Sequence, residues 1–420
     1  MSEAEVVEPI DLATADPSQV PLDKFDVSQP GIFQNNTLWG YFKRLREEDP
    51  IHYCPQSMFG PYWSITKFND IMAIDKDHKR FSSEAGITLP DRQSDFTTPN
   101  FISMDPPKHD VQRKAVTGVV APMNLAKLEP IIRERAAKIL DSLPLDTEFN
   151  WVDLVSIELT TQMLATLFDF PFEERRKLTY WSDMATSGEL NGGPTPEPVR
   201  RAALLECLEV FQGLWKEREG KDPSDDIDLI SMLAHNADTQ NMDPMEYLGN
   251  LILLIVGGND TTRNSITGGV LFLNENPAEY DKLRADPGLI PKMVPEIIRY
   301  QTPLAFMRRT AMEDVEIGGK TIKEGDKVVM WYVSGNRDDE VIDRPDEFII
   351  DRDTPRHHLS FGFGIHRCMG NRLAEMQLRV LWEEIMERFE KIEVVGEPER
   401  VQSSFVKGYN ELMVRLHPKQ

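Results

Sequence analysis

Apolar residues recur at helical spacing along most of this chain. Leu38, Phe42 and Leu45 stand among charged residues and predict a helix over 38–48 that ends before Pro50. The run 244–274 is the longest helical candidate, roughly 45 Å at 1.5 Å per residue. It is apolar on almost all sides, which predicts a central helix. Further helices are expected at 67–77, from the Pro106-Pro107 pair to about 120, and at 127–142, 151–168, 172–187, 198–219, 277–285, 291–300 and 369–389.

Strand patterns are fewer and gather late in the chain. Residues 51–65 alternate around Gly60-Pro61 and predict a pair of strands. A β-rich segment is expected over 306–333, with turns at 318–319 and 324–326, and final strands reach about 416. The sequence therefore predicts a mainly α fold with a minor β region.

Several stretches lack a hydrophobic period. Residues 1–35 carry Glu, Asp, Pro and Ser, which predicts an extended, flexible N-terminal arm. Residues 81–104 form a long irregular stretch of the kind that is usually functional or lid-like, and a second one, charged, covers 335–357. A glycine-rich break at 191–194 separates two helices and is typical of a movable cover, although a plain surface hairpin explains it nearly as well.

The composition limits the classes of binding partner and the cellular compartment that we expect for this protein. A formal net charge of −23 argues against nucleic acid or an anionic membrane as the main partner. Three cysteines, Cys54, Cys207 and Cys368, lie far apart, which disfavours structural zinc and a disulfide framework. The longest aliphatic run, 251–256, is too short for a transmembrane segment. We therefore expect a cytoplasmic protein.

The most informative stretch is 361–370, where Cys368 is flanked by glycines ahead of a helical run. A cysteine in a tight loop at a helix N-terminus would have a lowered thiol pKa and would suit axial ligation of haem iron. Gly364 and Gly370 would let the backbone pass close to a flat macrocycle, and Phe361 would keep water from the sulfur. For an isolated cysteine, the better explanation is a buried, inert side chain beside a glycine turn.

The expected central helix contains a run that helix propensity disfavours, Gly257-Gly258-Asn259-Asp260-Thr261-Thr262. The Thr261 hydroxyl could bond to the carbonyl of Gly257 four residues earlier and open the helix locally. Asp260 and Thr261 could then deliver protons to an oxygen species bound to iron. A close approach of two helices at the glycine pair, with Asp260 solvated, explains the run equally well.

Other polar residues become candidates for a site because of where they stand in the chain. Glu296 and Arg299 are three apart and can pair on one helix face, which by itself is common. The two propionates of a haem would need charge-assisted hydrogen bonds when buried. Four scattered donors stand beside predicted turns or strand edges: His109, Arg113, Arg309 and His366. Motifs for kinases, nucleotide-binding folds, zinc proteases and serine hydrolases are missing from the sequence.

Taken together, these motifs resemble the cytochrome P-450 family of haem-thiolate monooxygenases. The order is Gly257-Gly258-x-Asp260-Thr261, then Glu296-x-x-Arg299, then Phe361-x-x-Gly364-x-His366-x-Cys368-x-Gly370. The resemblance implies a triangular-prism fold in a single large domain over 36–420. It also implies one haem b with Cys368 as the proximal ligand and metal-binding residue.

The resemblance assigns roles to the remaining residues. It implies Asp260 and Thr261 in oxygen activation, and Glu296 with Arg299 as a structural pair that supports the cysteine loop. It implies the propionate contacts His109, Arg113, Arg309 and His366. The family often adds an arginine from a Pro-Glu-Arg-Phe stretch, which here reads Pro345-Asp346-Glu347-Phe348. The candidates for that third partner are Arg337, Arg344 and Arg352.

The longer string 257–265 resembles the soluble bacterial alkane hydroxylases of this family, which oxidise terminal carbons of medium-chain alkanes and fatty acids. The apolar flanks agree with an aliphatic pocket, although most apolar residues are simply core. The expected substrate-binding residues are Leu251, Leu254, Ile255, Gly257, Gly258, Leu304, Phe306, Phe405 and Val406. The alternatives are a terpene or steroid substrate, a haem protein that does not oxygenate, and a peroxygenase.

The sequence holds no flavin or nicotinamide domain, so electrons are expected from a [2Fe-2S] ferredoxin and an NAD(P)H-dependent ferredoxin reductase, with O2 as co-substrate. Cations near the cysteine loop could form a local docking patch on this acidic protein. They are Lys108, Lys114, Arg367 and Arg372.

Overall fold

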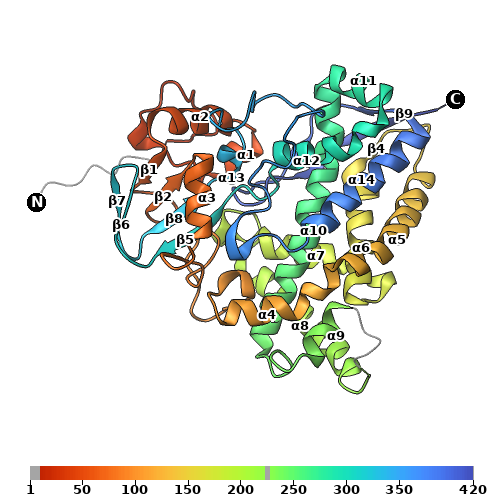
Figure 1. Cartoon of the computed structure of the whole chain (residues 1–420), viewed down its shortest axis with the longest axis horizontal. Coiled ribbons are helices and arrows are strands. Elements are labelled where there is room, and N and C mark those ends of the chain that lie inside the picture. Colours follow the sequence, from red (N-terminus) through yellow and green to blue (C-terminus); the bar gives the residue numbers. More distant parts are fainter. Residues whose placement is uncertain (1–9, 223–227, 420) are drawn as a thin grey trace, which may run out of the picture.

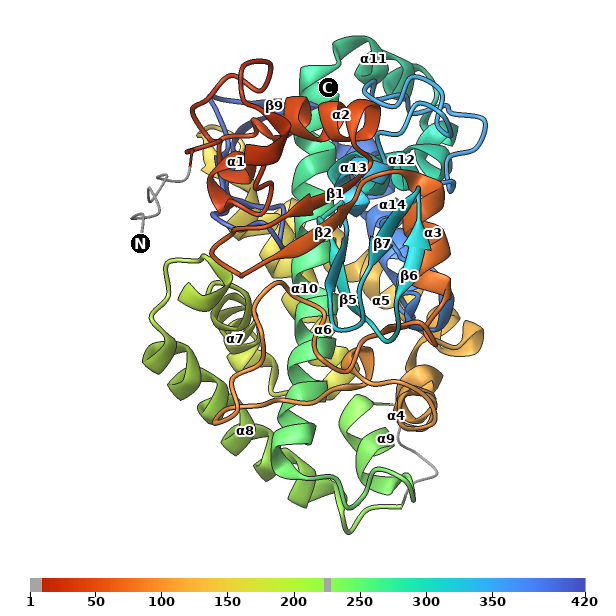
Figure 2. The same cartoon turned by 90° about the vertical axis from the view of Figure 1, so that its left-hand side faces the viewer.

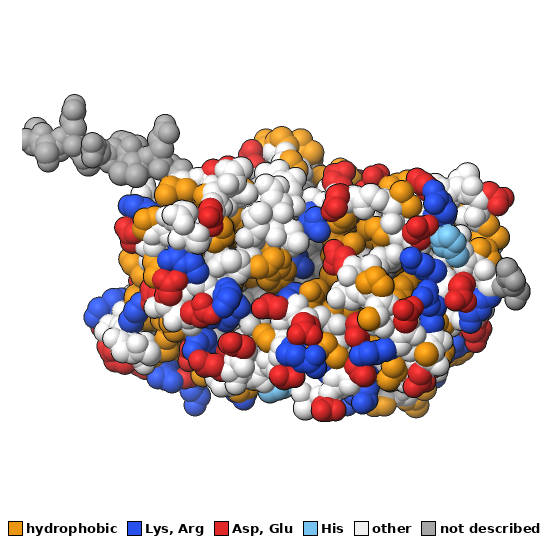
Figure 3. All heavy atoms as spheres, turned by 90° about the horizontal axis from the view of Figure 1, so that it is seen from above, with side chains coloured by type: hydrophobic (Ala, Val, Ile, Leu, Met, Phe, Trp, Pro, Cys, Tyr) orange, Lys and Arg blue, Asp and Glu red, His pale blue; other side chains and the backbone are white. Residues whose placement is uncertain are grey.

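The computed structural model describes residues 10–222 and 228–419. Helices form one broad side of the molecule and a smaller β-rich region forms the other, so that the outline is roughly triangular (Figure 1). The mainly α fold with a minor β region is therefore confirmed. Figure 3 shows acidic and basic side chains interspersed over the face seen from above, with a hollow near its middle.

The long helix α10 (Pro244–Glu275) runs through the centre of the molecule, as Figures 1 and 2 show. It begins at the predicted residue, because the Asp243 side chain accepts a hydrogen bond from the Met245 backbone N–H, 2.9 Å away. The helices packed on it are α6 (Glu158–Phe168), α7 (Arg176–Thr186), α8 (Glu197–Arg218), α11 (Pro277–Ala285), α12 (Ile290–Gln301) and α14 (Asn371–Arg388).

The other helices also follow the hydrophobic pattern. They are α2 (Leu38–Glu48), α3 (Phe68–Lys76), α4 (Lys108–Thr117) and α5 (Pro122–Asp141). Helix α5 starts five residues before the prediction, with Pro122 in its first turn, where the missing N–H costs nothing. The segment before α6, Val152–Ile157, is a π-helix, and α9 (Leu229–His235) was not predicted. The Asp228 side chain caps α9 by accepting from the Ser231 N–H at 2.9 Å.

The main sheet has the strand order β1-β2-β8-β5-β3. Strands β1 (Ile51–Cys54) and β2 (Tyr62–Ile65) form the predicted antiparallel pair, with Ile51 opposite Ile65. Strand β8 (Lys327–Met330) runs parallel to β2 and antiparallel to β5 (Met307–Ala311), and β3 (Phe81–Ser82) follows at the edge. This sheet places the late β segment beside the N-terminal third of the chain.

Short strands complete the β region. A hairpin joins β6 (Val315–Ile317) and β7 (Lys320–Ile322) through Gly318 and Gly319, whose φ angles are 57° and 75°. The turn predicted there is confirmed, because such positive φ angles favour glycine. Near the C-terminus, β4 (Phe149–Asn150), β12 (Met413–Pro418) and β9 (Phe389–Val394) form a small sheet, and β10 (Glu399–Arg400) pairs with β11 (Tyr409–Glu411).

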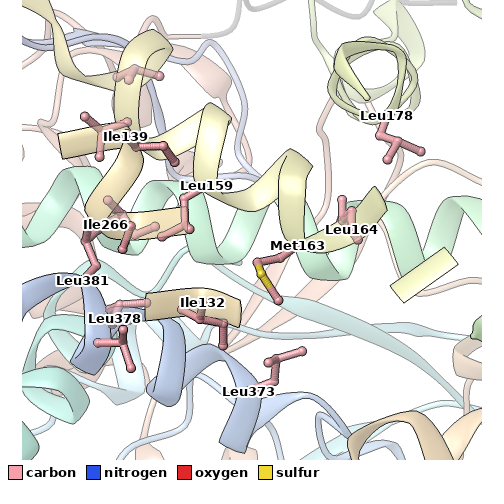
Figure 4. Close-up of a cluster of buried hydrophobic side chains, with 14 of the residues drawn as sticks. Ile132, Ile139, Leu159, Met163, Leu164, Leu178, Ile266, Leu373, Leu378 and Leu381 are labelled. Atoms are coloured by element: carbon pink, nitrogen blue, oxygen red, sulfur yellow. The ribbon is translucent and has the colours of Figure 1, made fainter. Parts of the chain in front are cut away.

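The largest hydrophobic core lies among the helices. Figure 4 shows side chains from α5, α6, α10 and α14 that point toward one another, including Ile132, Met163, Ile266 and Leu378. Their burial holds α14 and the loop before it against α10. Within the described ranges, no helix combines the length and the hydropathy that a membrane crossing requires.

The extended N-terminal arm is corrected by the structure for residues 10–35. Leu12, Phe25 and Ile32 are buried in a core that also contains Trp331. A short helix α1 (Pro30–Gln34) forms in this segment. These apolar residues lack a period because the chain is mostly irregular there, so their burial depends on tertiary contacts. Residues 1–9 lie outside the described residues.

Candidate active site

The loop that presents Cys368 lies between a 3-10 turn, Gly364–His366, and the first residue of α14. The Cys368 backbone N–H donates to the Phe361 carbonyl at 2.8 Å, which closes the loop. The Cys368 residue is exposed as a whole, while desolvation by the surrounding protein raises the pKa of its thiol. The N–H groups of Gly370 and Asn371 act in the opposite direction on that pKa. The expectation of a lowered pKa is corrected, because burial outweighs the helix N-terminus.

Gly364 and Gly370 have different surroundings in this loop. Gly364 has a φ angle of 67°, and a Cβ atom on it would lie 2.4 Å from the backbone oxygen of Asp75. The loop therefore passes directly against the end of α3 at a point where only glycine fits. A Cβ atom on Gly370 would meet no protein atom within 4 Å, so the backbone there borders open space.

Three of the four donors, which the sequence spreads from position 109 to position 366, act on the fourth, His366. Burial, followed by the charges of Arg309, His109 and Arg113, lowers the pKa of His366 to about 2. The rings of His109 and His366 meet edge to face with centroids 4.5 Å apart. Arg113 donates to the backbone carbonyl of Arg367, and Arg309 forms a buried ion pair with Asp75 at 2.7 Å.

These residues fit the carboxylates of a haem. His109 Nε2 and His366 Nδ1 are buried and have no hydrogen-bond partner in the described protein. Their other ring nitrogens are engaged, with Asp110 at 2.8 Å and with the Ser83 hydroxyl at 3.0 Å. Buried polar atoms without partners are costly, and an anion that accepts from both imidazoles would remove that cost.

On the central helix, the Thr261 hydroxyl donates to the Gly257 carbonyl at 2.8 Å, as predicted. A Cβ atom on Gly257 would meet no protein atom within 4 Å, so the helix borders open space here. A Cβ atom on Gly258 would lie 2.7 Å from Leu164 Cδ2 on α6. The glycine pair therefore serves both purposes that the sequence allowed, an open groove on one side and a close helix contact on the other.

Asp260 is fully buried, which corrects the alternative that it is solvated. Its carboxylate accepts from the Ser182 hydroxyl at 3.0 Å and from the Asn259 side chain at 2.9 Å. Arg263 lies 3.2 Å from it and also pairs with Asp183 on α7 at 2.7 Å. Burial raises the pKa of Asp260, and the Arg263 charge only partly offsets this rise. The Asp260 carboxylate thus bonds toward α7, whereas Thr261 faces the groove.

The Glu296–Arg299 pair is buried, with Arg299 Nε 2.7 Å from Glu296 Oε2. The third member of the network is Arg352, whose Nε donates to the same carboxylate oxygen at 2.9 Å. Arg337 instead pairs with Asp346 at 3.3 Å, and Arg344 is exposed. Arg299 also donates to the backbone carbonyls of Asn336, Pro345 and Glu347.

This network reaches the cysteine loop through one residue. Asn336 offers its backbone oxygen to Arg299 at 2.8 Å, and its side-chain oxygen accepts from the Leu359 N–H at 2.7 Å. The pair therefore supports the segment that leads into the cysteine loop.

Eight of the nine expected pocket residues separate into two groups, and the ninth, Gly258, packs against Leu164 on α6. Leu254, Leu304 and Phe405 keep partly exposed apolar surface, as Gly257 does with its backbone. The other group packs in the core and does not line an open pocket, because their side chains are covered by neighbours: Leu251, Ile255, Phe306 and Val406. The rings of Phe306 and Phe405 lie 5.3 Å apart, so Phe306 supports the lining from behind.

Some residues of the site were missed. Ser182 and Asp75 hold site residues from elements that are distant in the sequence, and no local pattern marks them. Arg263 stands three residues after Asp260 on the same helix, so its spacing was a usable signal.

Comparison with known proteins agrees with this geometry. A family model described as Cytochrome P450 matches residues 288–414. The chain is 35% identical over 410 residues to linalool 8-monooxygenase of Pseudomonas putida, a match that covers 95% of this chain and 100% of that protein. This chain belongs to the cytochrome P450 family. Its cofactor is haem b, and it is a monooxygenase of lipophilic substrates that uses O2 and electrons from redox partners.

Solved structures of other cytochromes P450 are similar over nearly the whole chain. Cytochrome P450-153 from Novosphingobium aromaticivorans is 44% identical with a TM-score of 0.87, and the match covers 93% of this chain and 99% of that one. CYP153D17 from Sphingomonas sp. is 48% identical with a TM-score of 0.88, over 94% and 100% of the two chains. Both names carry the same number, 153.

Proposed function

We propose that this cytochrome P450 hydroxylates the terminal carbon of medium-chain alkanes or fatty acids. The observation that carries the proposal is the open side of the central helix at Gly257 and Thr261. Three of the expected pocket residues, Leu254, Leu304 and Phe405, are partly exposed and apolar. An aliphatic chain gains free energy from burial against such side chains and needs no polar partner. The resemblance of the string 257–265 to that of the soluble bacterial alkane hydroxylases supports the same substrate class.

The residues of this chain have distinct tasks in that reaction. Haem, when bound, supplies the activation of dioxygen, for which a thiolate ligand favours O–O cleavage. Cys368 would provide that ligand, and His109, Arg113, Arg309 and His366 would hold the haem carboxylates.

Thr261 and Asp260 would bind and transfer protons. The Thr261 hydroxyl hydrogen is held by the Gly257 carbonyl, so its oxygen is left to accept a hydrogen bond from a proton-bearing group in the groove. Asp260 has a raised pKa because it is buried, so it keeps a proton more readily than an ordinary aspartate. Its side chain accepts from the hydroxyls of Ser182 and Thr186, at 3.0 and 3.4 Å, and these contacts connect it to α7.

A terpene alcohol is the second candidate substrate, because the chain is 35% identical to linalool 8-monooxygenase over 95% of its length. An isoprenoid chain is branched, whereas the proposed substrates are linear. One methylene is worth only about 1–3 kcal/mol in a hydrophobic pocket, so a graded series of substrates is needed to separate the two.

The experiment titrates the purified holoenzyme with alkanes and fatty acids of six to fourteen carbons and with linalool, and follows the haem spectrum and the products. We expect saturable shifts for the linear series and 1-alkanols or ω-hydroxy acids as products in the presence of a ferredoxin, its reductase and NADH. Linalool oxidation at a higher kcat/KM than every linear substrate would contradict the proposal. Turnover with hydrogen peroxide alone, at the same rate, would indicate a peroxygenase instead.

We also propose a [2Fe-2S] ferredoxin and its NAD(P)H-dependent reductase as the electron donors, received at the face beside the cysteine loop. Lys114, Arg367 and Arg372 are exposed there and have no ion-pair partner among the described residues. Lys108 is also exposed, but it pairs with Glu246 at 2.5 Å and is partly neutralised. Unpaired cations suit an acidic partner on a protein that is otherwise strongly negative.

A further inference from the structure

Asp75, near the end of α3, is buried with 2% of its surface exposed. Both of its carboxylate oxygens are used. Oδ1 accepts from Arg309 Nη2 at 2.7 Å, while Oδ2 accepts from the Tyr332 hydroxyl at 2.7 Å and from the Phe363 backbone N–H at 2.8 Å. One buried carboxylate therefore joins strand β5, the segment after β8, and the cysteine loop.

The loop lies close to α3 over several residues. A Cβ atom on Gly362 would lie 3.3 Å from Asp75 Oδ2, and one on Gly364 would lie 2.4 Å from the Asp75 backbone oxygen. The Phe363 ring packs against Phe68, with centroids 6.4 Å apart, and the Lys76 ammonium lies 5.5 Å from its centroid. The start of the cysteine loop thus has little freedom to move relative to Asp75.

Arg309 is fixed by the same contact. Its Nη2 donates to Asp75, and its Nη1 donates to the Arg308 carbonyl at 2.8 Å, so the plane of the guanidinium is set. Asp75 therefore orients a guanidinium that is one of the four donors expected to hold the haem carboxylates.

We propose that Asp75 is a positioning residue that sets Arg309 and the cysteine loop in one fixed arrangement, so that the cation for a haem carboxylate and the sulfur ligand are placed together. The proposal concerns haem retention and does not depend on the identity of the substrate. Charge-assisted hydrogen bonds to a buried carboxylate are short and directional, which suits this task. Asp75 also balances the Arg309 charge, so its removal leaves a net positive charge near the cofactor.

The test compares Asp75→Asn with wild type as holoenzyme. We expect haem transfer to apomyoglobin to be at least tenfold faster, and the red-shifted band of the ferrous carbon monoxide complex to be partly lost. The haem midpoint potential should shift in the positive direction, because an uncompensated Arg309 favours the more negative, reduced centre.

Two further variants separate positioning from general stability. Asp77→Asn removes a carboxylate two residues away that pairs with Arg80 at 2.5 Å, and it should change none of the three readings. Tyr332→Phe removes one hydrogen bond but keeps the Asp75 charge, so haem release should rise by about twofold with no change in potential. Wild-type haem release and potential in Asp75→Asn would overturn the proposal. If Asp75→Asn yields no holoenzyme, urea unfolding of the wild-type and variant apoproteins is compared. An unchanged urea midpoint supports a positioning role. A strongly lowered midpoint overturns the proposal in favour of a structural role.

Discussion

The hydroxyl of Thr261 donates a hydrogen bond to the carbonyl oxygen of Gly257, 2.8 Å away and four residues earlier on α10. Ser265 repeats the pattern one turn later and donates to the Thr261 carbonyl at 2.8 Å. The two bonds are chemically alike, but only the first borders the open side of the helix at Gly257. The chain thus contains its own matched pair for testing the role of the groove hydroxyl.

Thr261→Ala should uncouple electron consumption from product formation. A positioned proton-transfer group contributes about 10²–10⁴-fold, so product per NADH oxidised should fall at least tenfold while NADH oxidation continues. Thr261→Ser retains the hydroxyl and should restore most of the yield. The measurement is the ratio of hydroxylated product to NADH consumed. Ser265→Ala is the control, and an equal loss of coupling in both alanine variants would contradict a specific role for Thr261.

Glu296→Gln should destabilise the protein strongly. Glu296 is fully buried and accepts from Arg299, from Arg352 and from the Ile349 N–H. Breaking a buried ion pair by removing one partner costs about 3–5 kcal/mol, because the two guanidinium groups lose their counter-charge. Urea unfolding of the variant and the wild type measures this free energy.

The matched control for that network is Arg344→Ala. Arg344 was an equal candidate for the third partner from the sequence, but it is exposed and pairs only with Asp343 and Glu347. It should leave the urea midpoint unchanged, whereas Arg352→Ala should lower it. Similar midpoints for the two arginine variants would contradict the assignment of Arg352.

Much of the helical framework could be predicted because a buried helix face leaves a period in the sequence. Helix α2 has the expected bounds, and α10 begins where expected and ends one residue later. Local spacing also identified the Glu296–Arg299 pair and the bond from Thr261 to Gly257. The convergence of His109 and His366 was anticipated only through the family resemblance, because nothing local brings the two together.

The remainder depends on tertiary contacts that leave no local signal. Asp75 and Arg309 are 234 positions apart, and neither stands in a recognisable motif for the other. Ile255 and Phe306 look like pocket residues in the sequence, but packing turns their side chains into the core. The choice of Arg352 likewise follows from the path of an irregular segment, which a periodic pattern cannot describe.

Lys407 should make stability depend on pH above neutrality. It lines a cavity of about 280 Å³ with Arg337 and Arg400. Burial and the charges of these two arginines lower its pKa from 10.5 to about 7, against a smaller opposing effect of Glu275. Between pH 7 and 10.5 the unfolded chain therefore holds a proton on Lys407 that the folded chain has lost, and folded stability rises with pH in that window.

The variant Lys407→Met isolates this effect, because the other titrating groups cancel in the comparison. The wild type should gain stability relative to the variant as pH rises from 7 to 10.5, with a slope of at most about 1.4 kcal/mol per pH unit. Urea unfolding at several pH values measures the difference. A constant difference across the window would show that Lys407 stays protonated in the folded protein.

Arg201 on α8 should control how fast substrates enter and leave. It donates to both carboxylate oxygens of Asp95, at 2.7 and 3.1 Å, and its guanidinium lies 5.0 Å from the centroid of the Phe96 ring. These contacts connect α8 to the irregular stretch 81–104. Arg201→Ala should raise the association and dissociation rates of a linear substrate together by about two- to fivefold, because exposed ion pairs are weak, and should leave Kd nearly unchanged.

Stopped-flow spectroscopy of the haem measures both rates. Lys177→Ala, which removes an exposed ion pair with Glu174 on the neighbouring α7 region, is the control and should leave the rates unchanged. A change in the dissociation rate alone, and therefore in Kd, would show that Arg201 acts on the pocket and not on its entrance.

Reversing two charges beside the cysteine loop should weaken electron delivery without disturbing the site itself. Lys114 and Arg372 are exposed and have no ion-pair partner in the part of the chain that the structure describes. Since paired charges mainly steer association, Lys114→Glu with Arg372→Glu should lower ferredoxin-driven turnover about tenfold at low salt and flatten its dependence on ionic strength. Carbon monoxide binding by the chemically reduced double variant should be unchanged. Lys216→Glu on α8 is the control for charge reversal at a distant site, and it should leave ferredoxin-driven turnover unchanged. Full turnover in the double variant would show that the donor binds elsewhere, because no other step requires these two cations.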